Sequence, residues 1–421
     1  MVKLLILADD FTGALDTGVQ FAEEGAATLV VTDPNYDFSP PPGGENVIVF
    51  DTETRHVSPE AAYRTISHAV SLAKGAGISY FYKKTDSALR GNIGAELAAL
   101  MDAAGAPRLH FVPAYPRMGR TTRQGIHYID GIPVAESVFG RDPFNPVTCS
   151  NVTELIGMQS ARKVFSIDKE PLSHDRNGIL VYDASTDADL KSIANGLARS
   201  RELNFLAGCA GFAAALPALL GLKGTAPTRK ELLSRLLVIC GSVNPITLAQ
   251  LDEAEKSGAL RLRIRPEQKL EPLWSFSREA ESTLKSWADL CRQNEICILD
   301  TNDLPGSDET AQYAAAHGLS LEETRAIIPK SVGGMVKRLL EFGLNSTFLV
   351  TGGDTLLGVM RQIGIDRLSP AGELEAGVVL SHFSFQGKSY PILSKSGGFG
   401  SKALMMELME KIRTPSAEKQ P

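Results

Sequence analysis

The chain has 421 residues, of which 43% are hydrophobic and 22% charged, and its formal net charge is -6. This length predicts two or three domains, of which we expect two, and the composition is that of a soluble globular protein. The negative net charge argues against a general nucleic-acid-binding protein, but a local basic pocket for a small anion remains compatible with it. The five scattered cysteines form no CxxC pair, which favours the reduced cytosol.

The first predicted element is a strand, because the apolar run from Leu4 to Ala8 is cut off by Asp9 and Asp10. A signal peptide would need a longer apolar region and a cleavage site after it. No stretch approaches the ~20 apolar residues that are needed to span a membrane. We therefore expect a cytoplasmic protein whose partners include neither a membrane nor nucleic acid.

Short β-like runs alternate with helical stretches through the first half of the chain. This alternation predicts an α/β domain with a mostly parallel sheet flanked by helices. Residues 114–150 are rich in Pro, Gly and Arg, and we expect them to form a long irregular segment with a functional role. The predicted strands are 4–8, 28–31, 47–50, 78–82, 109–113, 163–167 and 179–182, and the predicted helices are 12–24, 59–73, 93–104 and 188–198.

The segment from Gly221 to Thr228, GLKGTAPT, is the predicted linker because it is rich in Gly and Pro. We place the boundary near residue 228, which gives domains 1–228 and 229–421. The second domain repeats the α/β alternation, and its last residues, 414–421, are predicted to be disordered. Its predicted strands are 236–240, 259–264, 296–300, 347–351 and 390–393.

The most informative cluster of polar residues is Tyr82 to Asn92, YKKTDSALRGN, which we place on a strand-to-helix loop. Asp10, Arg55 and Arg117 likewise follow predicted strands. In a parallel sheet the carboxyl ends of the strands face one crevice, so these residues should converge. The sequence therefore predicts an anion site at this edge.

The residue types suggest a role for each side chain. Arg55 and Arg90 could hold the carboxylate of a substrate through two parallel hydrogen bonds, and Lys84 could add a charge. Asp10 or Asp86 could accept a proton from a hydroxyl, although an aspartate before a helix is often only its N-cap. Lys83 should point to the opposite face and be structural or on the surface. The histidines lack metal-ligand spacing, and no cluster suggests zinc.

Three predicted strands of the second half run into glycine-containing loops that open helices. These loops are Gly241 to Pro245, Gly352 to Thr355, and Ser394 to Gly400. Amides at helix N-termini suit phosphate, and three such loops on one sheet indicate a nucleotide. For any single loop the alternative is an ordinary βα connection. Gly387-Lys388-Ser389 resembles the end of a Walker loop, but a strand follows it, and no GxGxxG opens a helix.

With these residues in hand, the chain resembles the four-carbon acid sugar kinase family nearly end to end. The resemblance implies an N-terminal acid-sugar domain and a C-terminal ATP domain that close over each other, with the active site in the interdomain cleft and Mg²⁺ on the nucleotide. The matching segments are LADDFTGALD (7–16), the Arg55 segment, KTDSALRGN (84–92), PAYPRMGRTT (113–122), GSVNP (241–245), TGGDT (351–355) and SKSGGFG (394–400).

The resemblance also implies which residues contact the ligands. It places the acid on Asp10, Arg55 and the segment from Lys84 to Ser87, and we add Arg90 because an arginine can bind a carboxylate. The expected acid-binding residues are therefore Asp10, Arg55, Lys84, Thr85, Asp86, Ser87 and Arg90. We expect Asp10 or Asp86 to be the catalytic base. The expected ATP contacts are Ser242, Gly352, Gly353, Asp354, Thr355, Gly397 and Gly398.

The function that we expect is phosphorylation of the terminal hydroxyl of D-threonate by ATP. Ala88 departs from the threonine that relatives commonly carry, whereas 139–147, FGRDPFNPV, resembles D-threonate kinases more than 3-oxo-tetronate kinases. The alternatives are a D-erythronate or 3-oxo-tetronate kinase, and a sensor that binds a sugar acid and a nucleotide without turnover. An NAD-dependent dehydrogenase is disfavoured by the missing fingerprint. The sequence leaves the Mg²⁺ ligands and the formation of a homo-oligomer open.

Overall fold

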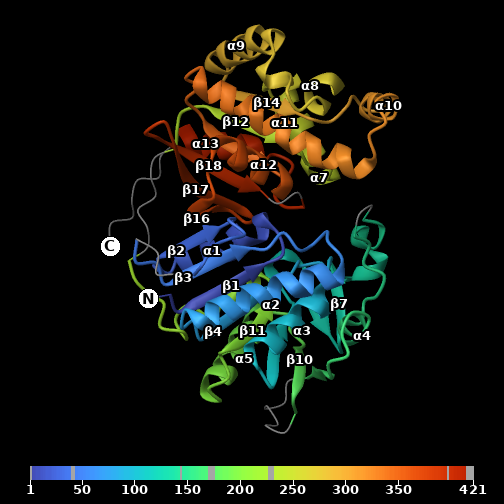
Figure 1. Ribbon diagram of the computed structural model, residues 1–421, viewed down its shortest axis with the longest axis vertical. Helices are drawn as coiled ribbons and strands as arrows, with labels where there is room; N and C mark the ends of the chain where they lie inside the picture. The colour runs from blue at the N-terminus through green and yellow to red at the C-terminus, as the bar shows by residue number, and fades with distance from the viewer. Residues whose placement is uncertain are drawn as a thin grey trace. The chain divides into compact units, whose positions relative to one another are not determined.

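The structure is a computed structural model that describes residues 2–38, 43–142, 145–168, 176–225, 232–395 and 398–413. The chain divides into two compact units, Met1–Pro227 and Thr228–Pro421 (Figure 1). The end of the predicted linker, from residue 226, and the predicted disordered tail from residue 414 lie outside the described residues. Among the helices of the described ranges, none combines the length and the apolar character that a membrane crossing needs.

The first unit is an α/β structure built on a parallel sheet with the strand order β2-β3-β1-β4-β11-β5-β10-β9. Strands β1, β3 and β10 are fully buried, which is typical of a parallel sheet covered by helices on both faces. The strands are β1 (Leu4–Ala8), β2 (Thr28–Val31), β3 (Val47–Asp51), β4 (Tyr80–Lys84), β5 (Arg108–Val112), β9 (Val164–Ile167), β10 (Gly178–Tyr182) and β11 (Phe205–Gly208).

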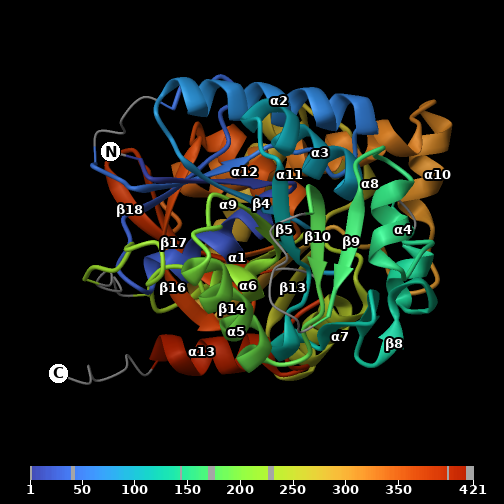
Figure 2. The same ribbon diagram turned by 90° about the horizontal axis from the view of Figure 1, so that it is seen from below.

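Helices cover both faces of this sheet. Figure 2 shows α2 and α3 on one side of the strands and α1, α5 and α6 on the other. Their ends follow local chemistry: Ser58 caps α2 with Pro59 at its first position, and Thr186 and Asp189 form a capping box at α5. The helices are α1 (Phe11–Ala22), α2 (Pro59–Gly75), α3 (Ile93–Ala104), α4 (Val152–Gly157), α5 (Asp187–Arg199) and α6 (Ala210–Ala213).

Two sequence-based expectations for the first unit need correction. The strand predicted at 78–82 runs from Tyr80 to Lys84, because parallel pairing with β1 and β11 continues through both lysines. The segment 114–150, predicted to be irregular, contains an antiparallel sheet and short 3-10 turns. The strands of this small sheet are β6 (Arg120–Arg123), β7 (Ile126–Ile129) and β8 (Ile132–Pro133), and the β6–β7 turn has positive φ at Gln124 and Gly125.

The second unit is also α/β, with the strand order β13-β14-β12-β15-β18-β17-β16. Pairing is parallel from β13 to β18 and antiparallel from β18 to β16. The antiparallel pair β16 and β17 was not predicted, and β18 is longer than the predicted 390–393 because it pairs along its whole length with β17. The strands are β12 (Leu236–Cys240), β13 (Leu260–Arg263), β14 (Ile296–Asp300), β15 (Thr347–Thr351), β16 (Arg367–Glu375), β17 (Val378–Phe385) and β18 (Lys388–Lys395).

Helices again pack on this sheet in two groups. Helix α11 contacts α8, α9 and α12, whereas α7 contacts α13. Gly387 lies in the turn between β17 and β18, so a strand and not a helix follows this segment, as predicted. The helices are α7 (Pro245–Lys256), α8 (Pro266–Leu270), α9 (Arg278–Gln293), α10 (Glu309–Ala316), α11 (Leu321–Glu341), α12 (Gly353–Ile363) and α13 (Leu404–Arg413).

Candidate active site

The polar strand ends of the first unit meet at one edge of its sheet, as predicted. Ala8, the last residue of β1, pairs with Asp51 of β3 on one side and with Lys84 of β4 on the other. Gly208 of β11 follows next to Lys84. All these strands are parallel, so the residues after them share the crevice at the carboxyl edge.

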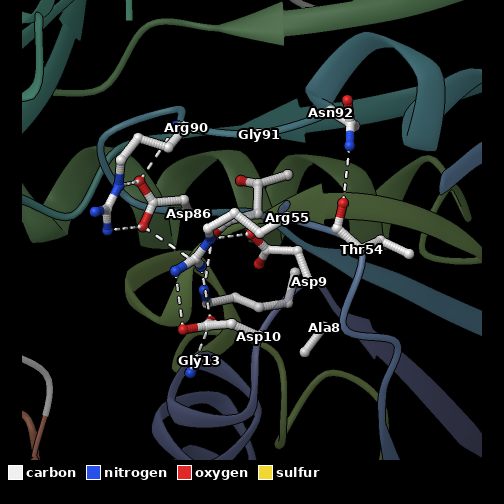
Figure 3. A network of polar contacts seen from close by, with 12 residues as sticks. Ala8, Asp9, Asp10, Gly13, Thr54, Arg55, Asp86, Arg90, Gly91 and Asn92 are labelled. Atoms are coloured by element: carbon white, nitrogen blue, oxygen red, sulfur yellow. Dashed lines mark hydrogen bonds and ion pairs between the residues drawn. The ribbon is translucent and has the colours of Figure 1, made fainter. Parts of the chain in front are cut away.

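Arg55 lies at the centre of this edge and is held by three carboxylates (Figure 3). Its Nε donates to Asp9 Oδ2 at 2.7 Å, its Nη1 to Asp10 Oδ2 at 2.9 Å, and its Nη2 lies 2.7 Å from Asp10 Oδ1. Asp86 Oδ1 is 3.6 Å from Nη2. Burial by itself lowers the pKa of Arg55, but the carboxylates of Asp10, Asp9 and Asp86 outweigh it and raise that pKa well above its usual value. Arg55 therefore gathers three carboxylates from two loops, those after β1 and β4.

Asp10 takes the N-cap role that the sequence left open, and its carboxylate stays partly exposed. It is the N-cap of α1, because its Oδ1 accepts the Gly13 amide at 3.0 Å. Its side chain is 21% exposed, whereas that of Asp9 is 2% exposed. A Cβ atom on Gly13 would lie 2.5 Å from Asp10 Oδ1 and 2.7 Å from Lys84 Nζ, so only glycine lets these two charged groups approach this turn of α1.

Asp86 is buried and surrounded by donors. Its Oδ2 accepts the amides of Ala88 and Arg90 at 3.2 Å and Arg90 Nε at 2.9 Å, and its Oδ1 accepts Arg90 Nη2 at 3.0 Å. Burial raises the pKa of Asp86, but Arg90, Arg55 and Lys84 together hold it well below the usual range. Asp86 is thus a stable anion that shapes its own loop, in which Leu89 adopts a φ of 63°.

The remaining residues of the predicted acid site lie beside this anion. Lys84 is buried, and its Nζ donates to the Thr85 carbonyl at 2.7 Å. The Thr85 hydroxyl is buried and has no hydrogen-bond partner among the described residues, and Ser87 is half-buried. Lys83 points the other way, to Glu96 at 2.8 Å and the Leu7 carbonyl at 3.1 Å, which confirms its structural role.

Several residues around the site were not predicted. Asp142 binds Arg90 Nη1 at 3.1 Å, and the Arg90 guanidinium lies 5.1 Å from the Phe139 ring centroid. His127 is fully buried, and burial lowers its pKa to about 4. No sequence signal marks these contacts, because they join segments that only the tertiary fold brings together. Arg117, predicted at the same edge, forms an exposed ion pair with Asp187, the first residue of α5, which follows β10.

The second unit has a corresponding edge, where β14, β12, β15 and β18 end at Asp300, Cys240, Thr351 and Lys395. The loop after β12 contains Ser242, and Asn244 caps α7 by accepting the Ile246 amide at 2.9 Å, as predicted. Pro245 opens that helix. Two loops at this edge, those after β12 and β15, lead directly into α7 and α12.

Close packing explains the glycines of these two loops. Gly352 caps α12 with a φ of 97°, a conformation that other residues rarely adopt. A Cβ on Gly241 would clash with the Thr355 hydroxyl. Gly353 opens α12, and Asp354 makes no cap but pairs with Arg325 through Oδ2 at 2.9 and 3.1 Å. The amides of Gly241 and Gly352 donate to the Thr351 and Lys395 carbonyls at 3.3 Å. The first turn of α12 has no side-chain cap, so its N–H groups fit a phosphate site.

The third loop is described only in part. Gly397 lies outside the described residues, and Gly398 is half-buried. Gln250 of α7 donates through Nε2 to the carbonyls of Phe399 at 3.0 Å and Ser401 at 2.8 Å, so α7 holds the end of this loop. Within the described ranges no group of three or more His, Cys, Asp or Glu side chains could hold a metal ion.

Comparison with known proteins identifies the family. Residues 4–216 match the model of a sugar-binding N-terminal domain, and residues 237–405 match that of a nucleotide-binding C-terminal domain. The chain is 28% identical to a D-threonate kinase of Salmonella typhimurium, over 97% of this chain and 98% of that one. The chain belongs to the four-carbon acid sugar kinase family.

Other members of the four-carbon acid sugar kinase family act on different acids. A D-erythronate kinase of Heliobacterium modesticaldum is 29% identical over 86% of each chain, and a 3-oxo-tetronate kinase of Pseudomonas savastanoi is 22% identical over 96% of each chain. As a member of this family the chain is an ATP-dependent sugar-acid kinase, which confirms the expected class of enzyme.

Solved structures share the fold of this sugar-acid kinase. A crystal structure of a Salmonella typhimurium protein superposes with a TM-score of 0.76 at 23% identity, covering 97% of this chain and 99% of that one. A Haemophilus influenzae protein gives a TM-score of 0.70 at 21% identity, covering 97% and 100%. At this level of identity the likeness concerns the fold alone.

Proposed function

We propose that this kinase transfers the γ-phosphate of ATP to the terminal hydroxyl of D-threonate. The observation that carries the proposal is the cluster of Asp10, Arg55, Lys84 and Asp86 at the carboxyl edge of the unit that matches a sugar-binding domain. Similarity over nearly the whole length to a D-threonate kinase supports the choice of acid. D-Erythronate and 3-oxo-tetronate are the second candidates, because kinases for both are relatives of this chain.

Asp10 is the base that we propose. Asp86 accepts hydrogen bonds from two amides and from Arg90 at both oxygens, and its lowered pKa makes it a weak proton acceptor. Asp10 is more exposed, and Arg55 and the Gly13 amide hold its orientation. Phosphoryl transfer depends mainly on positioning and charge neutralisation, so an oriented carboxylate beside the hydroxyl suffices.

The other polar residues of the edge would bind the acid. In this proposal Lys84 supplies positive charge, and Thr85 and Ser87 supply hydroxyls for the substrate's carboxylate and hydroxyl groups. Arg55 and Arg90 also belong to the acid site, where each holds an aspartate in place. A pocket that separates hydroxyl epimers does so through such fixed hydrogen bonds.

The residues of the second unit fit a nucleotide bound with Mg²⁺. The proposed ATP contacts are Ser242, Gly352, Gly353, Asp354, Thr355, Gly397 and Gly398. The N–H groups of the first turn of α12, where Gly352 offers no side-chain cap, suit phosphate oxygens. Mg²⁺ usually binds through phosphates, waters and one or two carboxylates, so it needs no larger acidic cluster, and Asp354 is the carboxylate in the first turn of α12. The ion would neutralise charge on the transferred phosphoryl group. Transfer further requires the two ligands to meet, for which we propose closure of the domains.

The test is ADP release by the purified protein with Mg²⁺-ATP and a panel of D- and L-threonate, D- and L-erythronate and 3-oxo-tetronates. We expect the highest kcat/KM with D-threonate. Higher turnover with another acid would reject D-threonate but keep the kinase. ATP binding without phosphorylation of any acid would instead favour the sensor.

A further inference from the structure

A buried histidine connects the β6–β7 hairpin to the loop that carries Thr85, Asp86 and Ser87. His127 Nε2 donates to the Ser87 carbonyl at 2.9 Å, and Nδ1 lies 3.0 Å from the Thr122 hydroxyl. A carbonyl only accepts, so the proton of the neutral imidazole lies on Nε2 and the Thr122 hydroxyl donates to Nδ1. The Ser87 carbonyl therefore fixes the tautomer, and the Thr122 hydroxyl supports it from inside the hairpin.

The hairpin itself is held by main-chain hydrogen bonds and does not depend on the imidazole. Thr122 and Ala184 exchange backbone hydrogen bonds at 2.9 and 3.0 Å, and the His127 amide donates to the Ser150 carbonyl at 2.9 Å. Thr122 and His127 also face each other in the β6–β7 register. The His127 ring thus extends from a fixed support toward the loop.

The contact at Ser87 acts on a single peptide group. The carbonyl of the Ser87–Ala88 peptide accepts from His127, while its N–H donates to Asp86 Oδ2 at 3.2 Å. The Ser87–Ala88 peptide plane is therefore fixed on both sides, at its carbonyl by the imidazole and at its N–H by the carboxylate. Without the imidazole the carbonyl would lose its buried partner, and the peptide could turn to find another. Such a turn would move both Ser87 and Asp86.

We propose that His127 is a positioning residue of this kinase, which orients the Ser87–Ala88 peptide and thereby sets the affinity for the sugar acid and the discrimination between its hydroxyl epimers. The proposal rests on the proposed function, because it assumes that the loop 84–90 binds the acid. His127 itself does not touch the substrate. Its effect should appear in the acid kinetics and not in the nucleotide kinetics.

The experiment compares His127→Phe, which removes the donor but keeps a ring of similar size, with His127→Gln, which keeps an N–H donor. We expect His127→Phe to raise the KM for the acid roughly 10-fold, the loss of one buried hydrogen bond, and to reduce the threonate/erythronate preference, with the KM for ATP unchanged. His127→Gln should recover most of both effects. Thr122→Val, which removes the hydroxyl that donates to Nδ1, should shift the acid KM in the same direction and serves if His127→Phe does not fold.

His110→Phe is the matched control. His110 is also buried and also hydrogen-bonded to a hydroxyl, that of Tyr182 at 2.9 Å, but it lies on β5 and its ring faces Tyr182 and Glu202. It should lower the melting temperature without changing the acid KM. Equal changes of the acid KM in both phenylalanine variants, or no change in either, would overturn the proposal. Calorimetry measures the affinity of each variant for the acid without turnover. If the wild type binds the acid but does not phosphorylate it, that result contradicts the proposed function and leaves the role of His127 open to the same test.

Discussion

Asp10 and Asp86 lie on either side of Arg55 but differ in what surrounds their carboxylates. Asp86 is enclosed by two amides and Arg90, whereas Asp10 keeps a partly exposed carboxylate in spite of its contacts with Arg55 and Gly13. The same residue type therefore serves two purposes a few ångströms apart: one anion builds the loop, and the other remains accessible to a ligand.

This difference predicts that replacing aspartate by asparagine acts mainly on turnover at residue 10 and mainly on stability at residue 86. Asp10→Asn should lower kcat by roughly 10²- to 10⁴-fold and should cost less stability than Asp86→Asn, because asparagine is an equally good N-cap and Arg55 keeps its pair with Asp9. Asp86→Asn should destabilise the protein by about 3 kcal/mol, since it leaves Arg90 and Arg55 with less compensating charge. Steady-state kinetics and thermal unfolding of both variants provide the measurement. An unchanged kcat in Asp10→Asn would rule out Asp10 as the base.

The buried histidines predict how stability depends on pH. Burial lowers the pKa of His110 and of His127 from 6.5 to about 4. Between pH 6.5 and pH 4 the unfolded chain binds more protons than the folded chain. The free energy of unfolding therefore decreases as the pH falls from 6.5 toward 4, by up to roughly 3 kcal/mol for each histidine. Burial raises the pKa of Asp51 and of Glu96, and these groups act in the opposite sense.

The contribution of one histidine to the pH dependence of stability is therefore measured by comparing the wild type with a variant that lacks it. Chemical unfolding of the wild type and of His110→Phe between pH 4 and 7 should show a smaller loss of unfolding free energy with acidification in the variant. Parallel curves for the two proteins would mean that His110 titrates alike in the folded and unfolded states.

At the scale of elements, the start of α1 is the part of the fold that most directly limits the candidate site. Asp10 caps this helix and Gly13 lies in its first turn, directly beneath Asp10 and Lys84. Close packing therefore joins the start of α1, the end of β4 and Arg55, which follows β3. A change of backbone position in any of them would be felt at the carboxylates.

The prediction for this element uses two glycine-to-alanine changes. Gly13→Ala should reduce kcat/KM for the acid by at least about 10-fold, because the new Cβ must displace Asp10 or Lys84 from a preorganised position. Gly196→Ala in α5, where nothing lies within 4 Å of the added Cβ, should leave activity unchanged and stabilise the protein by about 0.5–1 kcal/mol. Full activity of Gly13→Ala would contradict the prediction, because it would mean that the added methyl group fits without displacing Asp10 or Lys84.

At the scale of the whole molecule, each of the two units has its own core. One cluster of buried side chains includes Leu5, Phe81 and Leu97, and another includes Val238, Leu349 and Leu408. Each unit also matches its own family domain, for sugar binding and for nucleotide binding. Ligand effects should therefore be separable by unit.

Hydrogen exchange followed by mass spectrometry tests this separation. D-Threonate alone should slow exchange in residues 84–92 and 120–129 of the first unit, and a non-hydrolysable ATP analogue alone should slow it in residues 240–247 and 351–356 of the second, because a bound ligand stabilises the state that it binds. Protection by the acid that is confined to the second unit would contradict the assignment of the acid site.

Local sequence patterns were sufficient for most of the fold. The predicted strands 4–8, 236–240, 296–300 and 347–351 and the helix 93–104 are found with the predicted bounds, because apolar runs and helix caps are encoded by neighbouring residues. Even the convergence of Asp10, Arg55 and Lys84 followed from strand order, since parallel strands end at a common edge. The hairpin β6–β7 and the antiparallel β16–β17 were missed, because their short polar or uneven strands carry little periodicity.

The sequence by itself determined the α/β class, the alternation of elements and the types of charged side chain at the site. Only the tertiary structure decided which groups pair: that Arg55 is held by Asp9, Asp10 and Asp86, that Lys83 is buried against Glu96, and that His127 reaches Ser87. The physical reason is that helix and strand propensities depend on residues a few positions apart. Ion pairs and buried hydrogen bonds instead depend on distances of a few ångströms between segments that lie tens of residues apart in the chain.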